Sequence, residues 1–392
     1  MFSVTGCSSR PSGTSARFHA GPTSCRPGWS PGGGAPVRQD DSGHVRQPEG
    51  GCPITSSFRS SGSVSSSVPS ASTAAPAPGS VGARGEFAVI GRLTAGLAPG
   101  SATTLGPGDD AAVITAADGR VVASVDVLVD GVHFRTDWAS GEQIGRRAAL
   151  ASMADIAAMG AVPTALLVGL TAPADIPEDL VLGLGRGLDA EAAAVGAGLV
   201  GGDLTRSEVL TISVTVLGDL RGAAPVTRSG ARPGQVVAVA GRLGWAAAGL
   251  TVLSRGFRSP AAVVGAYRVP EPPLAQGPVA AAAGAGAMID VSDGLLADLG
   301  HIAVASGVGV DVRTAQLPVA PRLAEVASAL GRDPLEWVLT GGDDHALAAT
   351  FAPDAVPDGW VVIGVVTDSD AGVVTVDGAA RDTPGGWDHF TS

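Results

Sequence analysis

The chain has 392 residues, 45% of them hydrophobic, and a formal net charge of −12. This length and hydrophobic content suffice for one or two hydrophobic cores, and the negative charge argues against a nucleic-acid surface, which needs clustered cations. All 25 basic residues are arginine. Because a P-loop and a protein-kinase site each need a lysine, the sequence excludes both of these nucleotide-binding designs.

Residues 1–80 differ in composition from the rest of the chain. They hold 6 Arg and 3 acidic residues, which leaves 19 Arg and 34 acidic residues in the remainder. The segment is rich in Ser, Gly and Pro and has few large apolar residues, so we expect it to be disordered. It lacks the continuous apolar core of a secretory signal, but a transit peptide and an incorrectly assigned start codon both stay open.

The three cysteines, Cys7, Cys25 and Cys52, all lie in this first segment. The remaining chain therefore has no thiol chemistry, and this is compatible with a reducing compartment. Apolar stretches are broken well short of the roughly 18 to 20 residues that span a bilayer. We expect a cytoplasmic protein without a membrane segment.

The ordered part is expected to begin with a short amphipathic helix near Gly85–Leu97. The motif Gly106-Pro-Gly-Asp-Asp110 is typical of a loop, and strands are predicted at 112–114 and 121–128. The dipeptide Asp118-Gly119 between the strands predicts a hairpin turn. That hairpin would bring Asp109 or Asp110 towards Asp126.

A helix is predicted for Glu142–Met159, with Asp155 as the acidic residue deep within it. An acid among small apolar residues indicates a metal ligand, although a solvent-facing position is an equal alternative. A strand at 166–170 and a helix at 177–195 lead to Gly201-Gly-Asp203, interpreted as a phosphate-binding turn or an ordinary one. A strand at 209–217 follows, and 225–234 is interpreted as a connector between domains.

In the second half, a strand ends at Asp290 and a helix is predicted to begin around Ser292. Ser292 fits an N-cap, and the same helix start also offers amide groups to an anion. Residues 339–347 join a helix to a strand, and Gly386-Trp-Asp-His-Phe390 lies near the end. We expect a mixed α/β (α+β) protein with domains at 81–225 and 226–392.

In order and spacing, these motifs resemble thiamine-monophosphate kinases. That family belongs to an ATP-binding superfamily that also contains aminoimidazole ribonucleotide synthetase, selenophosphate synthetase and a hydrogenase maturation factor. Six motifs occur in family order: Gly-Asp-Asp at 108–110, Asp-Gly-Val-His-Phe at 130–134, Asp-Ile-Ala-Ala-Met-Gly-Ala at 155–161, Gly-Gly-Asp at 201–203, Ile-Asp-Val-Ser-Asp-Gly-Leu at 289–295 and Gly-Trp-x-His-Phe at 386–390. The resemblance covers residues 85–390.

The resemblance implies a two-domain fold like that of aminoimidazole ribonucleotide synthetase, a homodimer formed through the amino-terminal sheet, and ATP between the halves. It implies the following ligands for several Mg²⁺ ions: Asp110, Ser124, the backbone at Val125, Asp126, Asp155, Asp203, Asp290 and Asp293. ATP would contact Gly202, Asp203, Arg228 and Ser292. Thiamine phosphate would contact His133, Asp343 and Trp387.

The implied reaction, transfer from ATP to thiamine monophosphate, needs no catalytic residue. A phosphate monoester is largely dianionic at neutral pH, so it needs no base, and bound Mg²⁺ would offset its repulsion from the triphosphate. Trp387 would stack on the cationic thiazolium ring; the alternative is an anchor for the carboxy terminus. His133 would otherwise be a core residue.

The chain departs from the family pattern at several positions. Asp343 and His345 stand where the family usually has Glu and often Tyr, Val125 replaces a common Thr, and Gly185 lies near an aromatic residue that faces adenine in some members. Two other functions stay open: a sister enzyme of the selenophosphate or aminoimidazole ribonucleotide synthetase type, and a non-catalytic protein that binds ATP and Mg²⁺.

Overall fold

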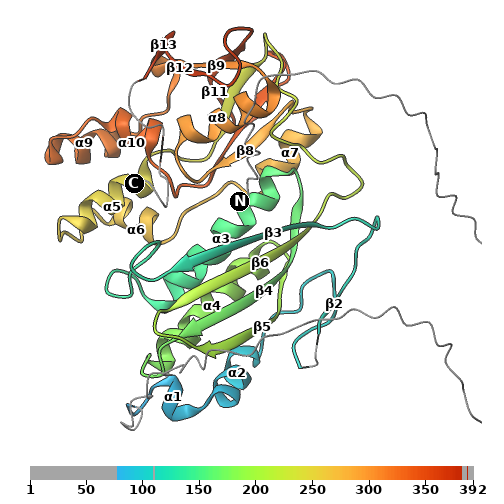
Figure 1. Ribbon diagram of the computed structural model, residues 1–392, viewed down its shortest axis with the longest axis vertical. Coiled ribbons are helices and arrows are strands. Elements are labelled where there is room, and N and C mark those ends of the chain that lie inside the picture. Colours follow the sequence, from blue (N-terminus) through green and yellow to red (C-terminus); the bar gives the residue numbers. More distant parts are fainter. Residues whose placement is uncertain (1–76, 109–110, 382–385, 387–392) are drawn as a thin grey trace, which may run out of the picture. The chain divides into compact units, whose positions relative to one another are not determined.

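The computed structural model describes residues 77–108, 111–381 and 386, which belong to one compact unit. The disorder predicted for residues 1–80 falls almost entirely outside these ranges, as do Asp110 and Trp387. Within them, two sheets with their helices form a mixed α/β fold (Figure 1). The predicted fold class is therefore confirmed. No helix in these ranges is long and apolar enough to cross a membrane.

A four-stranded sheet forms the first half. Its strands, in spatial order, are β3 (Val122–Val129), β6 (Thr211–Asp219), β4 (Val162–Ala172) and β5 (Gly198–Arg206). Strands β4 and β5 are parallel and are connected by helix α4 (Glu178–Ala194), whereas β6 is antiparallel to both of its neighbours. Buried and half-buried residues alternate along β6, so the helices cover one face of the sheet and leave the other open.

Helix α3 (Gly141–Ala158) packs against α4 and against the covered face of this sheet. It begins with a capping box, in which the Ser140 side chain accepts from the Gln143 amide and the Gln143 side chain accepts from the Ser140 amide. The helix also contacts β8, β10, α6 and α7 of the second half. It therefore links the two sheets.

The amino-terminal helices α1 (Val81–Arg84) and α2 (Glu86–Thr94) are held to α4 by one carboxylate. Glu178 is buried at the start of α4 and forms ion pairs with Arg84 at 3.0 Å and Arg92 at 2.5 Å. The predicted amphipathic helix is α2, which ends three residues before Leu97.

A seven-stranded sheet forms the second half. In spatial order, its strands are β13 (Ala379–Ala380), β12 (Val374–Val376), β9 (Gly309–Val312), β11 (Val361–Thr367), β7 (Val236–Ala240), β10 (Ala346–Phe351) and β8 (Met288–Val291). The helical segments of this half are α5 (Trp245–Ser254), α6 (Ala261–Arg268), α7 (Gln276–Ala282), α8 (Leu295–Ser306), the 3₁₀ turn η1 (Thr314–Gln316), α9 (Pro321–Leu330) and α10 (Pro334–Thr340). All residues of β8 and β10 are buried.

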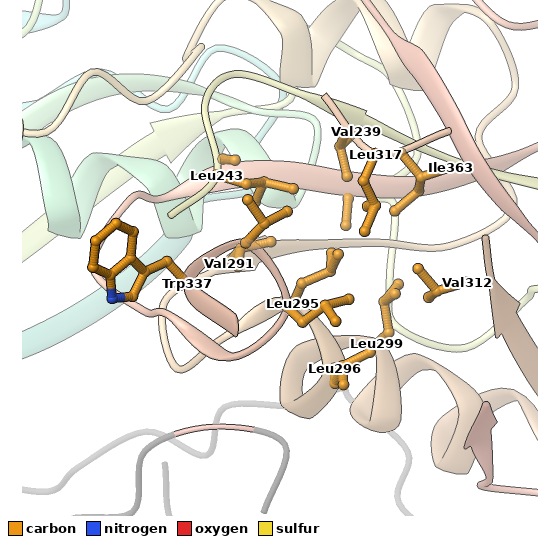
Figure 2. Packing of buried hydrophobic residues seen from close by; sticks show 14 of the residues in the cluster. Val239, Leu243, Val291, Leu295, Leu296, Leu299, Val312, Leu317, Trp337 and Ile363 are labelled. Atoms are coloured by element: carbon orange, nitrogen blue, oxygen red, sulfur yellow. The ribbon is translucent and has the colours of Figure 1, made fainter. Parts of the chain in front are cut away.

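Each half has its own hydrophobic core. Side chains of α8 pack against those of β7, β8, β9 and β11 in the second half, as Figure 2 shows. A separate cluster fills the space between α3, α4 and the four-stranded sheet. A third cluster combines Ala157 and Ala158 of α3 with Met288, Phe351 and Trp360. The end of α3 is therefore buried in the second half.

The predicted hairpin at Asp118-Gly119 is wrong. The strand before it, β2 (Val113–Ile114), pairs with β1 (Thr103–Leu105), whereas β3 pairs with β6 along its whole length. The turn exists, because Asp118 accepts from the Arg120 amide at 3.0 Å. It connects two different sheets because β6 offers β3 an eight-residue partner that a two-residue strand cannot match.

Candidate functional site

Three acidic side chains from different elements approach one another beside α3. Asp126 lies on the covered face of β3, Asp155 lies in the last part of α3, and Asp290 lies in β8 of the other sheet. Ser124, two residues before Asp126 and on the same face, donates a hydrogen bond to Asp155 Oδ2 at 2.5 Å. The structure thus brings together four of the predicted ligands.

The electrostatics of this cluster suit a cation. Burial, together with the charges of Asp290 and Asp126, raises the pKa of Asp155 to about 7, although the hydrogen bond from Ser124 lowers it. Burial also raises the pKa of Asp126, although a hydrogen bond from Ser152 lowers it. Carboxylates that raise one another's pKa have too little positive charge around them, and a bound cation would supply it. Carboxylate and hydroxyl oxygens are ligands that fit Mg²⁺.

One basic side chain near the cluster is that of His345. Its Nδ1 lies 3.1 Å from Asp290 Oδ2. Burial lowers the pKa of His345, but the hydrogen bond to Asp290 and the Asp290 charge raise it overall. The described residues contain no group of three His, Cys, Asp or Glu side chains arranged to hold a metal alone.

The loop between β8 and α8 carries Ser292 and Asp293. Helix α8 begins at Leu295 with Gly294 as its N-cap residue, so the predicted helix start and N-cap at Ser292 are wrong. The backbone amides of Asp293 and Gly294 donate to Asp298 Oδ2 at 3.1 and 3.0 Å. This buried carboxylate takes the capping role, and the Ser292 side chain is not a cap.

Gly202 and Asp203 lie inside strand β5, so the predicted turn at these residues is wrong. A Cβ atom on Gly202 would be 2.2 Å from the Val168 carbonyl oxygen, and this explains why a glycine stands in the strand. The ladder aligns Asp126 with Val214, Val168 and Gly202. Asp203 is one residue further, so it faces the open side of the sheet.

Asp203 is therefore separated from the other carboxylates within one chain. Strands β3 and β5 are the two edges of the four-stranded sheet, three strand spacings apart, or about 14 Å. The Asp203 residue is exposed. The structure does not bring Asp203 to Asp126.

An apolar cavity of about 80 Å³ opens beside Gly202 and Asp203. Its walls come from α2, α4 and the strands β4 and β5, and they are lined mainly by Leu, Ile and Val. Leu93 of α2 occupies the space next to Gly185 of α4, where an added Cβ would lie 2.5 Å from Leu93 Cδ2. The helix anchored by Glu178 thus supplies part of this cavity.

His133 lies in the turn that follows β3. The Val129 amide donates to His133 Nδ1 at 3.0 Å, so the ring proton of the neutral imidazole is on Nε2. Phe134 is buried beneath the turn, and Asp130 accepts from the Thr136 amide at 3.2 Å. This local bond helps to fix the orientation of the histidine ring.

The motif Gly341-Gly-Asp-Asp-His345 forms a loop between α10 and β10, as predicted. Asp343 Oδ1 pairs with Arg147 Nη2 of α3 at 2.8 Å. Asp344 Oδ1 accepts from the Ala246 amide at 2.8 Å, and its Oδ2 is buried with no hydrogen-bond partner among the described residues. Burial raises the pKa of Asp344 to about 7.

The remaining predicted residues are distributed around this loop. Arg228 lies between β6 and β7, and its carbonyl accepts from Ser306 Oγ at 3.0 Å. Gly386 lies against Asp293, because a Cβ atom there would be 2.4 Å from the Asp293 carbonyl oxygen. Val125 points its side chain to the open face, 59% exposed.

Known proteins provide an independent comparison. Residues 108–220 match the family of AIR synthase related proteins, N-terminal domain. The thiamine-monophosphate kinase of Mycobacterium tuberculosis is 50% identical over 307 residues, which cover 78% of this chain and 92% of that protein. The enzyme of Corynebacterium glutamicum is 42% identical over 319 residues, 79% of this chain and 95% of that protein.

This chain belongs to the thiamine-monophosphate kinase family. Among solved structures, AaThiL complexed with AMPPCP and TMP has a TM-score of 0.66 and 30% identity, covering 78% of this chain and 97% of that one. Thiamine-monophosphate kinase from Stenotrophomonas maltophilia K279a has a TM-score of 0.65 and 34% identity, covering 75% and 95%. The predicted membership is confirmed, and the chain is an ATP-using kinase.

Sequence reasoning about this kinase missed several buried polar residues of the site: Arg147, Ser152, Asp298 and Asp344. Arg147 had a signal, because it occupies an otherwise apolar face of the predicted helix. Asp298 gave no such signal, because the helical pattern around it does not distinguish a buried acid from a solvent-facing one. Asp344 adjoins the predicted Asp343, but the pattern does not say which of two neighbouring acids is buried.

Proposed function

We propose that this chain transfers the γ-phosphoryl group of ATP directly to thiamine monophosphate, with several Mg²⁺ ions at its carboxylates, and so forms thiamine diphosphate. The observation that carries the proposal is the cluster of Asp126, Asp155 and Asp290 between two sheets in a chain 50% identical to a thiamine-monophosphate kinase. No side chain has to remove a proton, because the acceptor phosphate is already largely dianionic.

The carboxylates of the cluster hold the cations. Asp126, Asp155 and Asp290 are the ligands that the electrostatics support best, and Ser124, Val125 and Asp293 adjoin them; Asp110, outside the described residues, belongs to the same set by its motif. Bound Mg²⁺ would offset the charge of the two phosphate groups during transfer. The chain's own part is to fix the carboxylates, which Ser124 does for Asp155.

The nucleotide is proposed to lie along β5. The apolar cavity beside Gly202 would take the base, since stacking and apolar contact suit a flat aromatic ring. Asp203 lies at the rim of that cavity, where a metal-bound phosphate would follow the base. Arg228 and Ser292 would contact the phosphates from the second half of the chain.

Thiamine phosphate is proposed to approach from the loops at His133 and Asp343. The Nε2–H of His133 is a donor suited to a phosphate oxygen, and the Asp343 carboxylate suits the cationic thiazolium. Trp387 is assigned to the same ring by its motif, and Gly386 beside Asp293 supports this position.

We infer that a second copy of the chain completes the site. The open face of the four-stranded sheet carries exposed Val125 and Val127, which a partner sheet would cover. If β5 of the partner borders β3, the partner's Asp203 lies beside the strand that carries Asp126, although the two residues lie about 14 Å apart in one chain. A homodimer therefore accounts for both the apolar face and the separated carboxylate.

The assay combines purified protein, ATP, Mg²⁺ and thiamine monophosphate, with free thiamine as the control acceptor. We expect equal amounts of thiamine diphosphate and ADP from the monophosphate alone. Nucleotide binding without either product would favour a non-catalytic protein, and product with another phosphate acceptor would favour a sister enzyme. Removal of Mg²⁺ by EDTA should abolish the product.

The shared site is tested with dimers that carry two different affinity tags. One subunit carries Asp126→Asn and the other carries Asp203→Asn. If the site combines Asp126 of one chain with Asp203 of the other, one of the two sites is intact and the mixed dimer keeps about half of the wild-type activity. Activity no higher than that of either single variant contradicts the shared site.

Two further proposals concern organisation. We infer domains at 81–225 and 226–392, because each sheet has its own core and the segment 220–235 connects the sheets. We also propose a cytoplasmic location, since no cysteine follows Cys52 and thiamine phosphate chemistry uses intracellular ATP. Limited proteolysis that yields fragments ending within 220–235 would support the domain boundary.

A further inference from the structure

Arg147 is an unusual residue for its position in the molecule. It lies in the first half of α3, where its side chain is only 3% exposed. Among the residues that the structure describes, no other arginine is buried. A buried guanidinium is costly unless its donors are paired. Its neighbour Arg146 instead lies 43% exposed and pairs with Glu191 of α4 at 2.5 Å.

The contacts of the Arg147 guanidinium are made with the second half of the chain. Its Nη2 pairs with Asp343 Oδ1 at 2.8 Å, its Nη1 donates to the Tyr267 carbonyl oxygen, and its guanidinium lies 4.9 Å from the centre of the Tyr267 ring. Hydrogen bonds and a cation–π contact thus compensate the buried charge. Helix α3 is thereby fixed to α6 and to the loop 341–345.

The ion pair is unequal in exposure. The Asp343 side chain is 41% exposed, whereas that of Arg147 is 3% exposed. The carboxylate therefore faces the solvent while the cation supports it from behind. Because the guanidinium is buried and already contacts three groups, it is poorly placed to bind a ligand itself.

The backbone around Asp343 depends on such side-chain contacts. Asp343 and His345 have positive φ angles of 67° and 52°, which cost energy for residues other than glycine. Three successive side chains connect the loop to different elements: Asp343 to Arg147, Asp344 to the start of α5, and His345 to Asp290. Only the first of these contacts reaches the first half of the chain.

We propose that Arg147 is a positioning residue, which holds the exposed Asp343 carboxylate at the place where it receives the cationic part of thiamine phosphate. Arg147 contributes to acceptor binding through Asp343 and does not touch the acceptor. This inference rests on the proposed function. It extends that function by making acceptor affinity depend on a buried residue of the opposite half, on the same helix as Asp155.

The test is steady-state kinetics with thiamine monophosphate and with ATP for Arg147→Met, Arg147→Lys, Asp343→Asn and the double variant Arg147→Met/Asp343→Asn. We expect Arg147→Met to raise the KM for thiamine monophosphate by about tenfold and to change the KM for ATP by less than about twofold, since one charge-assisted contact is lost. Arg147→Lys should recover part of this loss, because it restores the charge without the planar fork.

The double variant separates positioning from simple damage. If Arg147 acts through Asp343, the double variant has the same KM for thiamine monophosphate as Asp343→Asn alone. Arg146→Met is the matched control on the same helix, and both KM values should stay within about twofold of the wild type. Thermal unfolding of each variant checks that the fold persists; if Arg147→Met does not fold, Arg147→Lys and Asp343→Asn carry the comparison.

The outcomes are distinguishable. If the wild-type protein is active and the KM for thiamine monophosphate is the same in the wild type, Arg147→Met and Arg147→Lys, this inference is overturned and the proposed function stays intact. Equal increases in both KM values also overturn it, because they indicate general damage. A wild-type protein that forms no thiamine diphosphate overturns the proposed function and this inference together.

Discussion

The two sheets of the molecule differ in how many of their faces are covered. In the four-stranded sheet, β6 alternates buried and half-buried residues, whereas every residue of β10 in the seven-stranded sheet is buried. The first sheet therefore has a face available to a second copy, and it divides its carboxylates between the covered side, with Asp126, and the open side, with Asp203. The second sheet contributes its site residues from edge strand β8 and from loops.

The largest loss of stability is expected when a charge is placed inside the seven-stranded sheet, which is covered on both faces. Ala348 in β10 is fully buried between Val239 and Ile289 of the adjacent strands. Ala348→Asp would bury an unpaired charge and should destabilise the protein by more than about 4 kcal/mol. Denaturant unfolding measures this. Ser213→Asp, on the open face of the central strand β6, is the matched control and should leave the monomer folded.

A large functional effect is expected at the covered face of the first sheet. Asp155→Asn should lower kcat by at least about 100-fold, because each 1.4 kcal/mol of lost charge stabilisation is tenfold in rate. The variant should fold at least as stably as the wild type without Mg²⁺, since burial and two neighbouring carboxylates raise the pKa of Asp155. Asp118→Asn, remote from the cluster, serves as the control in the same kinase assay. Near-normal turnover of Asp155→Asn would contradict the metal assignment.

The open face of the four-stranded sheet is tested by a charge on its edge strand β3. Val125→Glu should separate the proposed dimer and lower activity, while the monomer keeps its thermal stability because the side chain is 59% exposed. Light scattering after size exclusion measures the mass. Val361→Glu changes a valine that is 44% exposed on the other sheet and should leave the oligomeric state unchanged. A Val125→Glu protein with unchanged mass would show that this face is not the interface.

The smallest change in stability is expected from Asp344, a buried acid in the loop before β10 of the seven-stranded sheet. Burial raises the pKa of Asp344 from 3.8 to about 7, so the folded state binds this proton more tightly than the unfolded chain does. Its contribution to stability is present below about pH 4 and is lost as the pH rises through about 7. Asp344→Asn removes this titration and keeps an acceptor for the Ala246 amide. It should therefore lose less stability than the wild type between pH 5 and pH 8.

Thermal unfolding in EDTA at the two pH values measures this difference. Asp155 and Asp298, whose pKa values are also raised to about 7, retain part of the pH dependence in the variant. The difference should consequently be a few degrees. An identical loss of stability in both proteins would mean that Asp344 is not protonated in the folded state at pH 5.

Local patterns predicted much of the fold. The helices at 142–159 and 177–195 were found because their apolar spacing and caps are local properties of the sequence. The hairpin at Asp118-Gly119 was wrong because strand pairing is non-local: a turn motif cannot show that β3 pairs with β6, some 90 residues later. Gly201-Gly-Asp203 was misread as a turn because Gly202 serves a close approach of β5 to β4.

The sequence predicted the acidic residues of the candidate site better than it predicted their places in the fold. The acids that the motifs mark are visible in the sequence, and the structure brings Asp126, Asp155 and Asp290 together. The sequence could not show that Asp203 lies on the opposite face and edge of the sheet, because that follows from the register of three strand pairs. Nor could it show which of Asp343 and Asp344 is buried, since the two are adjacent in one loop.

The contact between Leu93 and Gly185 limits which substitutions this chain accepts at these two positions during evolution. An added Cβ at residue 185 would meet Leu93 Cδ2 at 2.5 Å, so a larger residue there is tolerated only after Leu93 has become smaller or has moved. Loss of the Leu93 side chain alone would leave the cavity wall open. The residues at positions 93 and 185 should therefore change as a pair if the wall of this cavity is to stay filled.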